Sequence, residues 1–110
     1  MAGKSSRTKG AAAEREVCQI IRDILLVDVN RNLDQTRDGG NDIDLGKYKL
    51  EIKRQETLAL PTWCRQVELA CNNDEIPVVV YRTSREPWRV VLPLEEFLLL
   101  LKANNDNRHC

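Results

Sequence analysis

The sequence predicts an α/β protein in which a central mixed β-sheet is flanked by helices. Three observations support this expectation. Apolar residues follow the helical period near the N-terminus, short alternating or valine-rich segments come next, and two later segments open with proline. The chain has 110 residues, of which 42% are hydrophobic, so we expect one domain with one core.

The N-terminal part divides into a basic arm and a first helix. Residues 1–9 are small, polar and basic, so we expect them to form a flexible arm. A single domain then spans 10–103, and 104–110 form a flexible tail. The first helix is expected from about Gly10 to about Val27, because apolar residues recur there at the helical period, at Ala13, Val17, Ile20, Ile21, Ile24 and Val27.

The remaining elements follow from polarity and from turn residues. Val29 and Leu33 suggest a bent strand over 28–36, and glycines mark a turn over 37–41. A two-stranded hairpin follows over 42–55. The expected later elements are a helix over 61–71, a valine-rich buried strand over 77–82, a strand over 88–92 and a final helix over 93–102.

Composition argues against some classes of site. The single histidine, His109, and four cysteines without a CxxC pair argue against a structural zinc site. No signal peptide or membrane-spanning segment is visible, so we expect a cytoplasmic protein with reduced thiols. Basic and acidic residues number 17 each, a balance that neither supports nor excludes nucleic acid as a partner.

The hairpin places charged residues on one face. A two-residue loop at 46–47 puts Asp42 opposite Glu51 and Asp44 opposite Lys49. Directly opposed side chains have Cβ atoms about 5 Å apart. Two carboxylates at that separation repel unless a positive charge lies between them, and a hard divalent cation binds such oxygen ligands. Asp42 and Glu51 are therefore predicted metal ligands.

Three neighbours of this pair have alternative interpretations. Asp44 is either an ordinary ion-pair partner of Lys49, which we favour, or a further metal ligand. Lys53 shares a face with Glu51, where its ammonium group is able to orient a metal-bound water, to stabilise developing negative charge, or to pair with Glu51 itself. The main-chain carbonyl of Ile52 is a candidate for one more oxygen ligand.

Two glutamates of the first helix compete for one role. The apolar stripe centres near Val17 and Ile24, and Glu14 lies about 60° from that centre, against about 100° for Glu16. A carboxylate near the buried edge of a helix needs a partner. Glu14 is therefore the predicted inward group, and the alternative is a boundary salt bridge with Arg15 or with a strand residue.

Several polar residues are candidates for contact with a nucleic-acid backbone. Gln55 extends the charged strand face, and Gln66 on the second helix is a weaker candidate. Trp63 and Trp88 are expected to pack in the core rather than to stack on bases. The basic candidates are Lys4, Arg7, Lys9, Arg15, Arg37 and Arg54, followed by Arg65, Arg82, Arg85 and Arg89.

The final helix predicts self-association. Residues 97–101 are apolar on nearly every side, which is more than one face against the core requires. We expect this segment to form part of a homodimer interface.

These residues resemble a known pattern. Asp42 followed by Glu51-Ile52-Lys53 is similar to the PD-(D/E)xK signature of the restriction-endonuclease-like nuclease superfamily, with Asn41 where proline often stands. Residues 9–16 resemble the first helix of archaeal-type Holliday junction resolvases, and 39–43 and 50–55 resemble small resolvase-like proteins of bacteriophages. The short turn at 46–47 departs from the family pattern.

The resemblance implies a restriction-endonuclease-like αβββαβ core and a metal-dependent DNA endonuclease. Asp42 and Glu51 would bind Mg²⁺ or Mn²⁺, Glu14 would complete the site, and Lys53 would be the catalytic lysine. The implied substrate is branched DNA, a four-way Holliday junction cut by a homodimer in the host cytoplasm. The alternatives are a nuclease indifferent to branching and a non-catalytic DNA-binding protein of the same fold.

Overall fold

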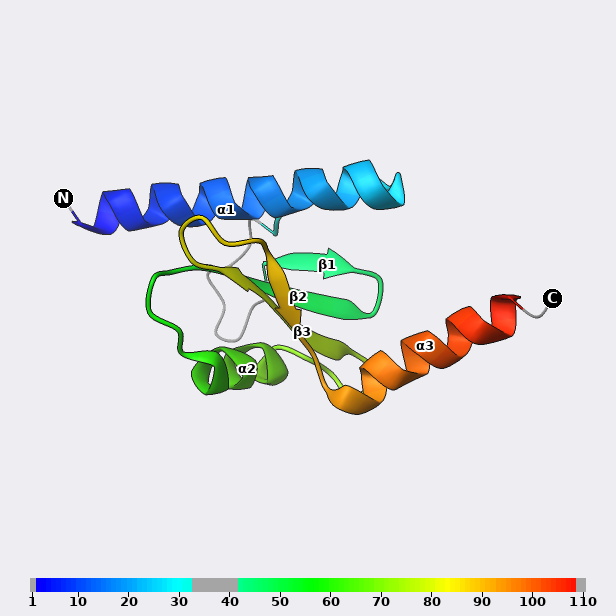
Figure 1. Cartoon of the computed structure of the whole chain (residues 1–110). Coiled ribbons are helices and arrows are strands. Elements are labelled where there is room, and N and C mark those ends of the chain that lie inside the picture. The colour runs from blue at the N-terminus through cyan, green and yellow to red at the C-terminus, as the bar shows by residue number, and fades with distance from the viewer. Residues whose placement is uncertain (1, 33–41, 109–110) are drawn as a thin grey trace.

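The computed structural model describes residues 2–32 and 42–108, and the side chains of 10–32 and 42–106. The turn expected over 37–41, with Arg37, lies outside the described residues. The described elements follow one another along the chain as shown in Figure 1. They are α1 (Ala2–Leu25), β1 (Ile43–Leu45), β2 (Tyr48–Arg54), α2 (Leu60–Leu69), β3 (Ile76–Arg82), β4 (Arg89–Val91) and α3 (Leu94–Arg108).

The four strands form one sheet in the order β1-β2-β3-β4, and the sheet is mixed, as the sequence predicts. β1 and β2 form an antiparallel hairpin in which Asp44 lies opposite Lys49, and the predicted register is confirmed there. Gly46 opens the tight turn with φ of 61°, a conformation that glycine adopts without steric cost. β2 and β3 run parallel because α2 crosses between them, and β4 returns antiparallel to β3.

Helices cover both faces of the sheet (Figure 1). Alternation along β2 and β3 sends successive side chains to opposite faces, so each face has its own apolar cluster. On the α2 face, Trp63 and Val67 bury Val79, which confirms that Trp63 is a core residue. On the α1 face the buried cluster joins the helix to the strands through Ala13, Val17, Cys18, Ile43, Leu50, Ile52, Val78 and Val80.

Three expectations about element boundaries are wrong. α1 begins at Ala2 rather than near Gly10, so residues 2–9 continue the first helix. α3 continues to Arg108, beyond the expected end near Lys102. In the described part of 28–36, the expected strand is reduced to one isolated bridge between Arg31 and Ile43. Since β1 has only three residues, it offers little edge on which a longer partner strand can pair.

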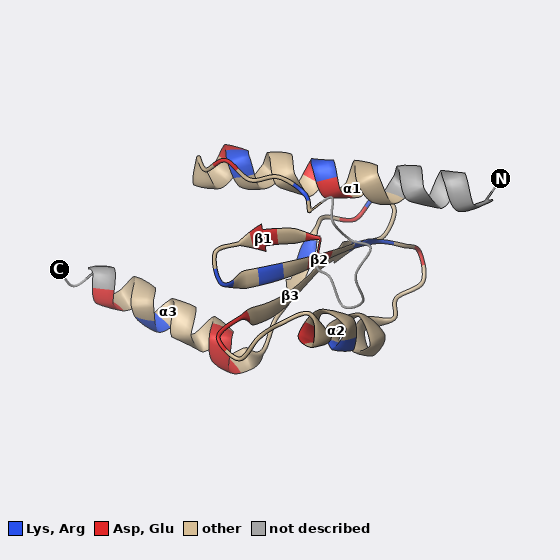
Figure 2. Cartoon of the chain, turned by 180° about the vertical axis from the view of Figure 1, so that it is seen from behind, with Lys and Arg blue, Asp and Glu red and all other residues tan. Residues whose placement is uncertain are grey.

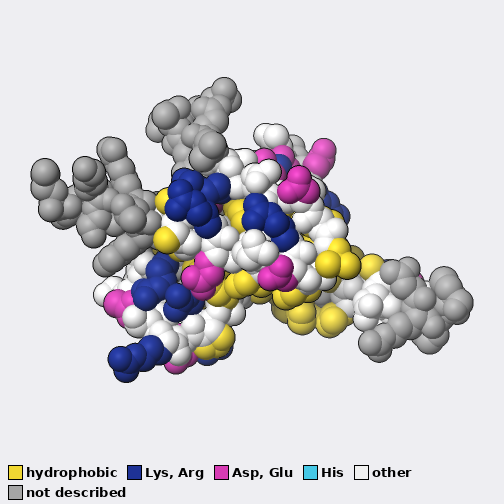
Figure 3. Space-filling model, turned by 90° about the horizontal axis from the view of Figure 1, so that it is seen from above, with side chains coloured by type: hydrophobic (Ala, Val, Ile, Leu, Met, Phe, Trp, Pro, Cys, Tyr) yellow, Lys and Arg dark blue, Asp and Glu magenta, His cyan; other side chains and the backbone are white. Residues whose placement is uncertain are grey.

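α3 projects away from the sheet and the other helices (Figure 1). The apolar run from Phe97 to Leu101 is exposed along its whole length. Seen from above, hydrophobic side chains gather on the side of the molecule where α3 leaves it (Figure 3). No helix in the part of the chain that the structure describes is both long enough and apolar enough to cross a membrane.

Candidate active site

Hydrogen bonds hold Asp42 against β2 at the start of the hairpin. Its main-chain amide donates a hydrogen bond of 2.9 Å to the carbonyl of Leu50, and its carbonyl accepts one of 2.7 Å from the amide of Asn32. The side-chain Oδ2 accepts a further bond of 2.7 Å from the amide of Ile52. Asp42 is only 7% exposed, so these bonds hold a carboxylate in a fixed, largely dehydrated position.

Glu51 shares this buried region with Asp42. The two carboxyl groups are close enough to share a hydrogen bond, so the structure brings together the pair that the hairpin register predicts. Burial, and next the charge of Asp42, raise the pKa of Glu51 to about 8, against the opposing effect of Lys53. Two carboxylates in contact require a proton or a cation between them, which is the chemical basis of a metal site.

Glu14 adds a third carboxyl group from α1. Its side chain points inward, with 8% of the residue exposed, whereas Glu16 lies at the surface and accepts a hydrogen bond from Trp88 Nε1 at 2.7 Å. Burial raises the pKa of Glu14; the Arg31 hydrogen bond opposes that shift and the charge of Asp42 adds to it. The helical geometry therefore predicted the correct inward glutamate.

Arg31 is the partner that sequence reasoning missed. Its Nε donates to Glu14 Oε1 at 2.9 Å, across the gap between α1 and the sheet edge. The expected partners of Glu14 were Arg15 or a strand residue, and Arg31 sits at the isolated bridge to Ile43. The only signal in the sequence was that Arg31 is a basic residue within 28–36, the segment expected to form a strand.

The three carboxyl groups form a chain with Asp42 in the middle, because Asp42 contacts both Glu14 and Glu51. They do not surround one point: among the described side chains, no three His, Cys, Asp or Glu groups already form a metal-binding cluster. The Asp42–Glu51 pair is the part that fits a hard divalent cation, since it is built only from oxygen donors that repel one another without one.

Acidic positions on β1 and basic positions on β2 lie on neighbouring strands (Figure 2), and lysines pair with two of the hairpin acids, Asp44 and Glu51. Lys53 Nζ is 3.7 Å from Glu51 Oε2, and both side chains are largely buried. Lys49 Nζ is 3.1 Å from Asp44 Oδ1 and 3.3 Å from Glu75 Oε2. The ion-pair interpretation of Asp44 is therefore confirmed.

The candidates for contact with DNA occupy different surroundings. Arg15, Gln55 and Gln66 are exposed, whereas Arg54 is partly buried and its Nη1 is 2.6 Å from Glu56 Oε2. Their roles stay predictions. The side chains of Lys4, Arg7, Lys9 and Arg37 lie outside those that the structure describes.

Comparison with known proteins identifies the family. No curated protein and no solved structure matches this chain. Residues 5–109 match the sequence model of a family described as "phage putative PDDEXK endonuclease". The match includes α1 with Glu14 and the hairpin with Asp42, Glu51 and Lys53. Because it spans nearly the whole chain, this protein belongs to that phage PD-(D/E)xK endonuclease family.

Proposed function

We propose that this protein is a metal-dependent endonuclease that hydrolyses phosphodiester bonds in branched DNA, as a Holliday junction resolvase. The observation that carries the catalytic part is the buried contact between the carboxyl groups of Asp42 and Glu51, with the Lys53 ammonium 3.7 Å from Glu51. Membership of the endonuclease family supports DNA as the substrate.

The proposed mechanism assigns one task to each side chain. Asp42 and Glu51 would hold Mg²⁺ or Mn²⁺, with the carbonyl of Ile52 as an additional oxygen donor. Glu14 would join them by turning its carboxyl group from Arg31 toward the ion. When bound, the ion supplies a nucleophilic water at neutral pH and neutralises phosphoryl charge. The hydrogen bond from the Ile52 amide keeps the Asp42 carboxylate aimed at this position.

Arg31 and Lys53 lie beside the two outer carboxyl groups, Glu14 and Glu51 respectively. Arg31 compensates the charge of Glu14, which keeps that carboxylate from being both buried and unpaired. Lys53 lies where its ammonium group is able to orient the attacking water or to stabilise negative charge on the phosphoryl oxygens.

A branched substrate is proposed because of the exposed apolar helix. A dimer joined through α3 would carry two active sites related by a two-fold axis, which matches the symmetry of a four-way junction. The reaction would take place in the host cytoplasm, where Cys18, Cys64 and Cys71, all free thiols, would stay reduced.

One cleavage assay tests the proposal. Labelled four-way junction, duplex and single strand are incubated with Mg²⁺, Mn²⁺ or chelator, using wild type, Asp42→Asn, Glu51→Gln and the matched control Asp44→Asn. We expect paired cuts near the branch point that require metal, are lost in the first two variants and survive in the control. Equal cutting of all three substrates would instead indicate a nuclease indifferent to branching. Binding without any cutting would indicate a non-catalytic DNA-binding protein.

A further inference from the structure

Two arginines lie side by side at the carboxyl ends of β2 and β3. Arg54 and Arg82 are register partners in the parallel pair, and both side chains lie on the α1 face of the sheet. Like charges on directly neighbouring strand positions repel one another. Glu56 and Glu16 offset that repulsion in this structure, and an anion bound between the two guanidinium groups would do so as well.

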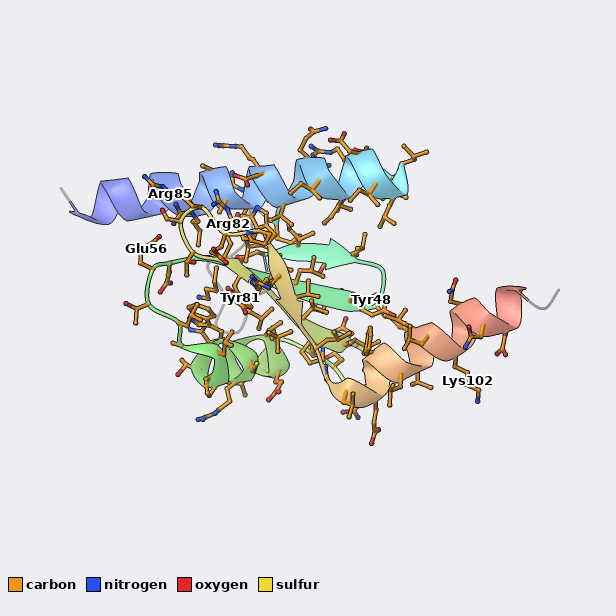
Figure 4. The ribbon with its side chains drawn as sticks, in the orientation of Figure 1. Tyr48, Glu56, Tyr81, Arg82, Arg85 and Lys102 are labelled. Carbon is orange, nitrogen blue, oxygen red and sulfur yellow. The ribbon has the colours of Figure 1, made fainter. Side chains whose placement is uncertain are left out.

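The two arginines line a pocket beneath α1. Its volume is about 680 Å³, within the range of ligand sites in proteins. Figure 4 shows Arg82 and Glu56 at this end of the molecule, below α1. The polar lining consists mainly of Arg54, Gln55, Arg82 and Ser84, with Glu16 and Glu56.

Arg82 is held in place but is incompletely hydrogen-bonded. Its guanidinium lies over the ring of Trp88, 5.3 Å from the ring centre. Its Nε is buried and has no hydrogen-bond partner among the described residues. The nearest carboxylate oxygen, Glu16 Oε1, is 3.6 Å away and is already bonded to the Trp88 indole at 2.7 Å. Arg82 is therefore held against Trp88 and Glu16 with one donor that makes no hydrogen bond within the described part of the chain.

The acids that now neutralise the pair are the more exposed partners. The side chains of Glu56 and Glu16 are 61% and 47% exposed, against 28% for Arg54 and 21% for Arg82. Exposed ion pairs contribute little, whereas arginine forms strong paired hydrogen bonds with phosphate oxygens. Glu56 also accepts a hydrogen bond of 3.1 Å from the Ser84 amide, and Glu16 one from Trp88, so a phosphate that displaced these carboxylates would have to replace their contacts with the arginines by stronger ones.

We propose that Arg54 and Arg82 together bind one backbone phosphate of the DNA substrate in this pocket. This rests on the proposed function only in taking DNA as the substrate. Arg54 follows Lys53 on β2, and the two side chains lie on opposite faces of the sheet. A DNA strand that reached both residues would therefore run past the carboxyl ends of β2 and β3. Contact with a phosphate carries no base preference, so the pocket positions DNA without reading its sequence.

The test measures binding in the absence of metal, so it is independent of cleavage. Fluorescence anisotropy of labelled duplex and four-way DNA is followed across a salt series in chelator. We expect Arg54→Gln and Arg82→Gln each to weaken binding and to lower the slope of log affinity against log salt by about 1. The control Lys47→Gln removes an exposed positive charge at the β1–β2 turn, outside the pocket lining, and should leave the slope unchanged.

A second pair of variants keeps the test decisive if an arginine variant fails to fold. Glu16→Gln removes a competing carboxylate, so we expect several-fold tighter binding. Glu86→Gln makes the same charge change outside the pocket lining and should have a smaller effect. The proposal is overturned if folded Arg54→Gln and Arg82→Gln keep the wild-type slope, or if Glu16→Gln binds no more tightly than Glu86→Gln.

Discussion

The Oδ2 atom of Asp42 lies 2.7 Å from the main-chain nitrogen of Ile52 and accepts its hydrogen bond. One residue thus closes the open end of the β1–β2 hairpin and presents a carboxylate beside Glu51. The structural contribution of Asp42 and its proposed catalytic contribution are consequently separable by substitution, because an asparagine keeps an oxygen acceptor but not the negative charge.

Asp42→Asn is expected to fold with a free energy of unfolding close to that of wild type and to lose cleavage. Asp42→Ala leaves the buried Ile52 amide without its acceptor, which costs about 1–3 kcal/mol. Urea unfolding in chelator, compared across the three proteins, measures the difference. Equal stability of the alanine and asparagine variants would show that the hydrogen bond does not hold the hairpin.

The raised pKa of Glu51 predicts that the metal-free protein loses stability as pH rises. The folded state holds the proton up to a pKa of about 8, whereas the unfolded chain releases it near 4.5. Stability from this group is therefore full below pH 4.5 and falls between 4.5 and 8, by at most about 1.4 kcal/mol per pH unit.

Glu51→Gln removes this titration, so its advantage over wild type should grow from pH 5.5 to pH 8.5. The measurement is the melting temperature of both proteins in chelator at several pH values. Glu14, whose pKa is also raised, contributes in the same direction but is present in both proteins. Parallel pH profiles for the two proteins would contradict the buried carboxyl contact.

The Glu14–Arg31 ion pair predicts that the effects of substituting these two residues on the free energy of unfolding are coupled, although the residues lie far apart in the sequence. Arg31→Gln alone should destabilise the protein, because it leaves the Glu14 carboxylate buried without its cation. Adding Glu14→Gln should recover much of that loss. A double-mutant cycle by chemical unfolding measures the coupling, expected at about 0.5–3 kcal/mol. Additive effects would show that the ion pair does not compensate the buried charge.

Turn residues and side-chain alternation in the sequence predicted the hairpin. The contacts that were not predicted depend on packing between segments far apart in the chain. The glycine turn and strict alternation determine the register of Asp44 and Lys49, and with it the approach of Asp42 to Glu51. The Arg31–Glu14 contact depends on how α1 packs over the sheet edge, and the spacing of apolar residues in the sequence does not determine that packing. The neighbouring positions of Arg54 and Arg82 depend on the parallel register across α2, and sequence alone does not determine that register.

The exposed apolar surface of α3 predicts a dimer in solution. Leu98 and Leu101 are about half exposed, and Phe97 and Leu100 of the same helix line an apolar groove of about 540 Å³ together with residues of α1 and the sheet. A monomer that left this surface in water would forgo about 25 cal/mol for each Å² of apolar area. Light scattering after size exclusion should therefore report twice the chain mass.

Replacing Leu98 and Leu101 together by glutamate should convert that dimer to a folded monomer, because charges would be buried at the interface without partners. Leu69→Glu is the matched control, since Leu69 is 82% exposed at the end of α2 and does not line the apolar groove. It should remain dimeric. If wild type elutes as a monomer at high concentration, α3 does not join two copies, and a two-fold symmetric substrate is no longer expected.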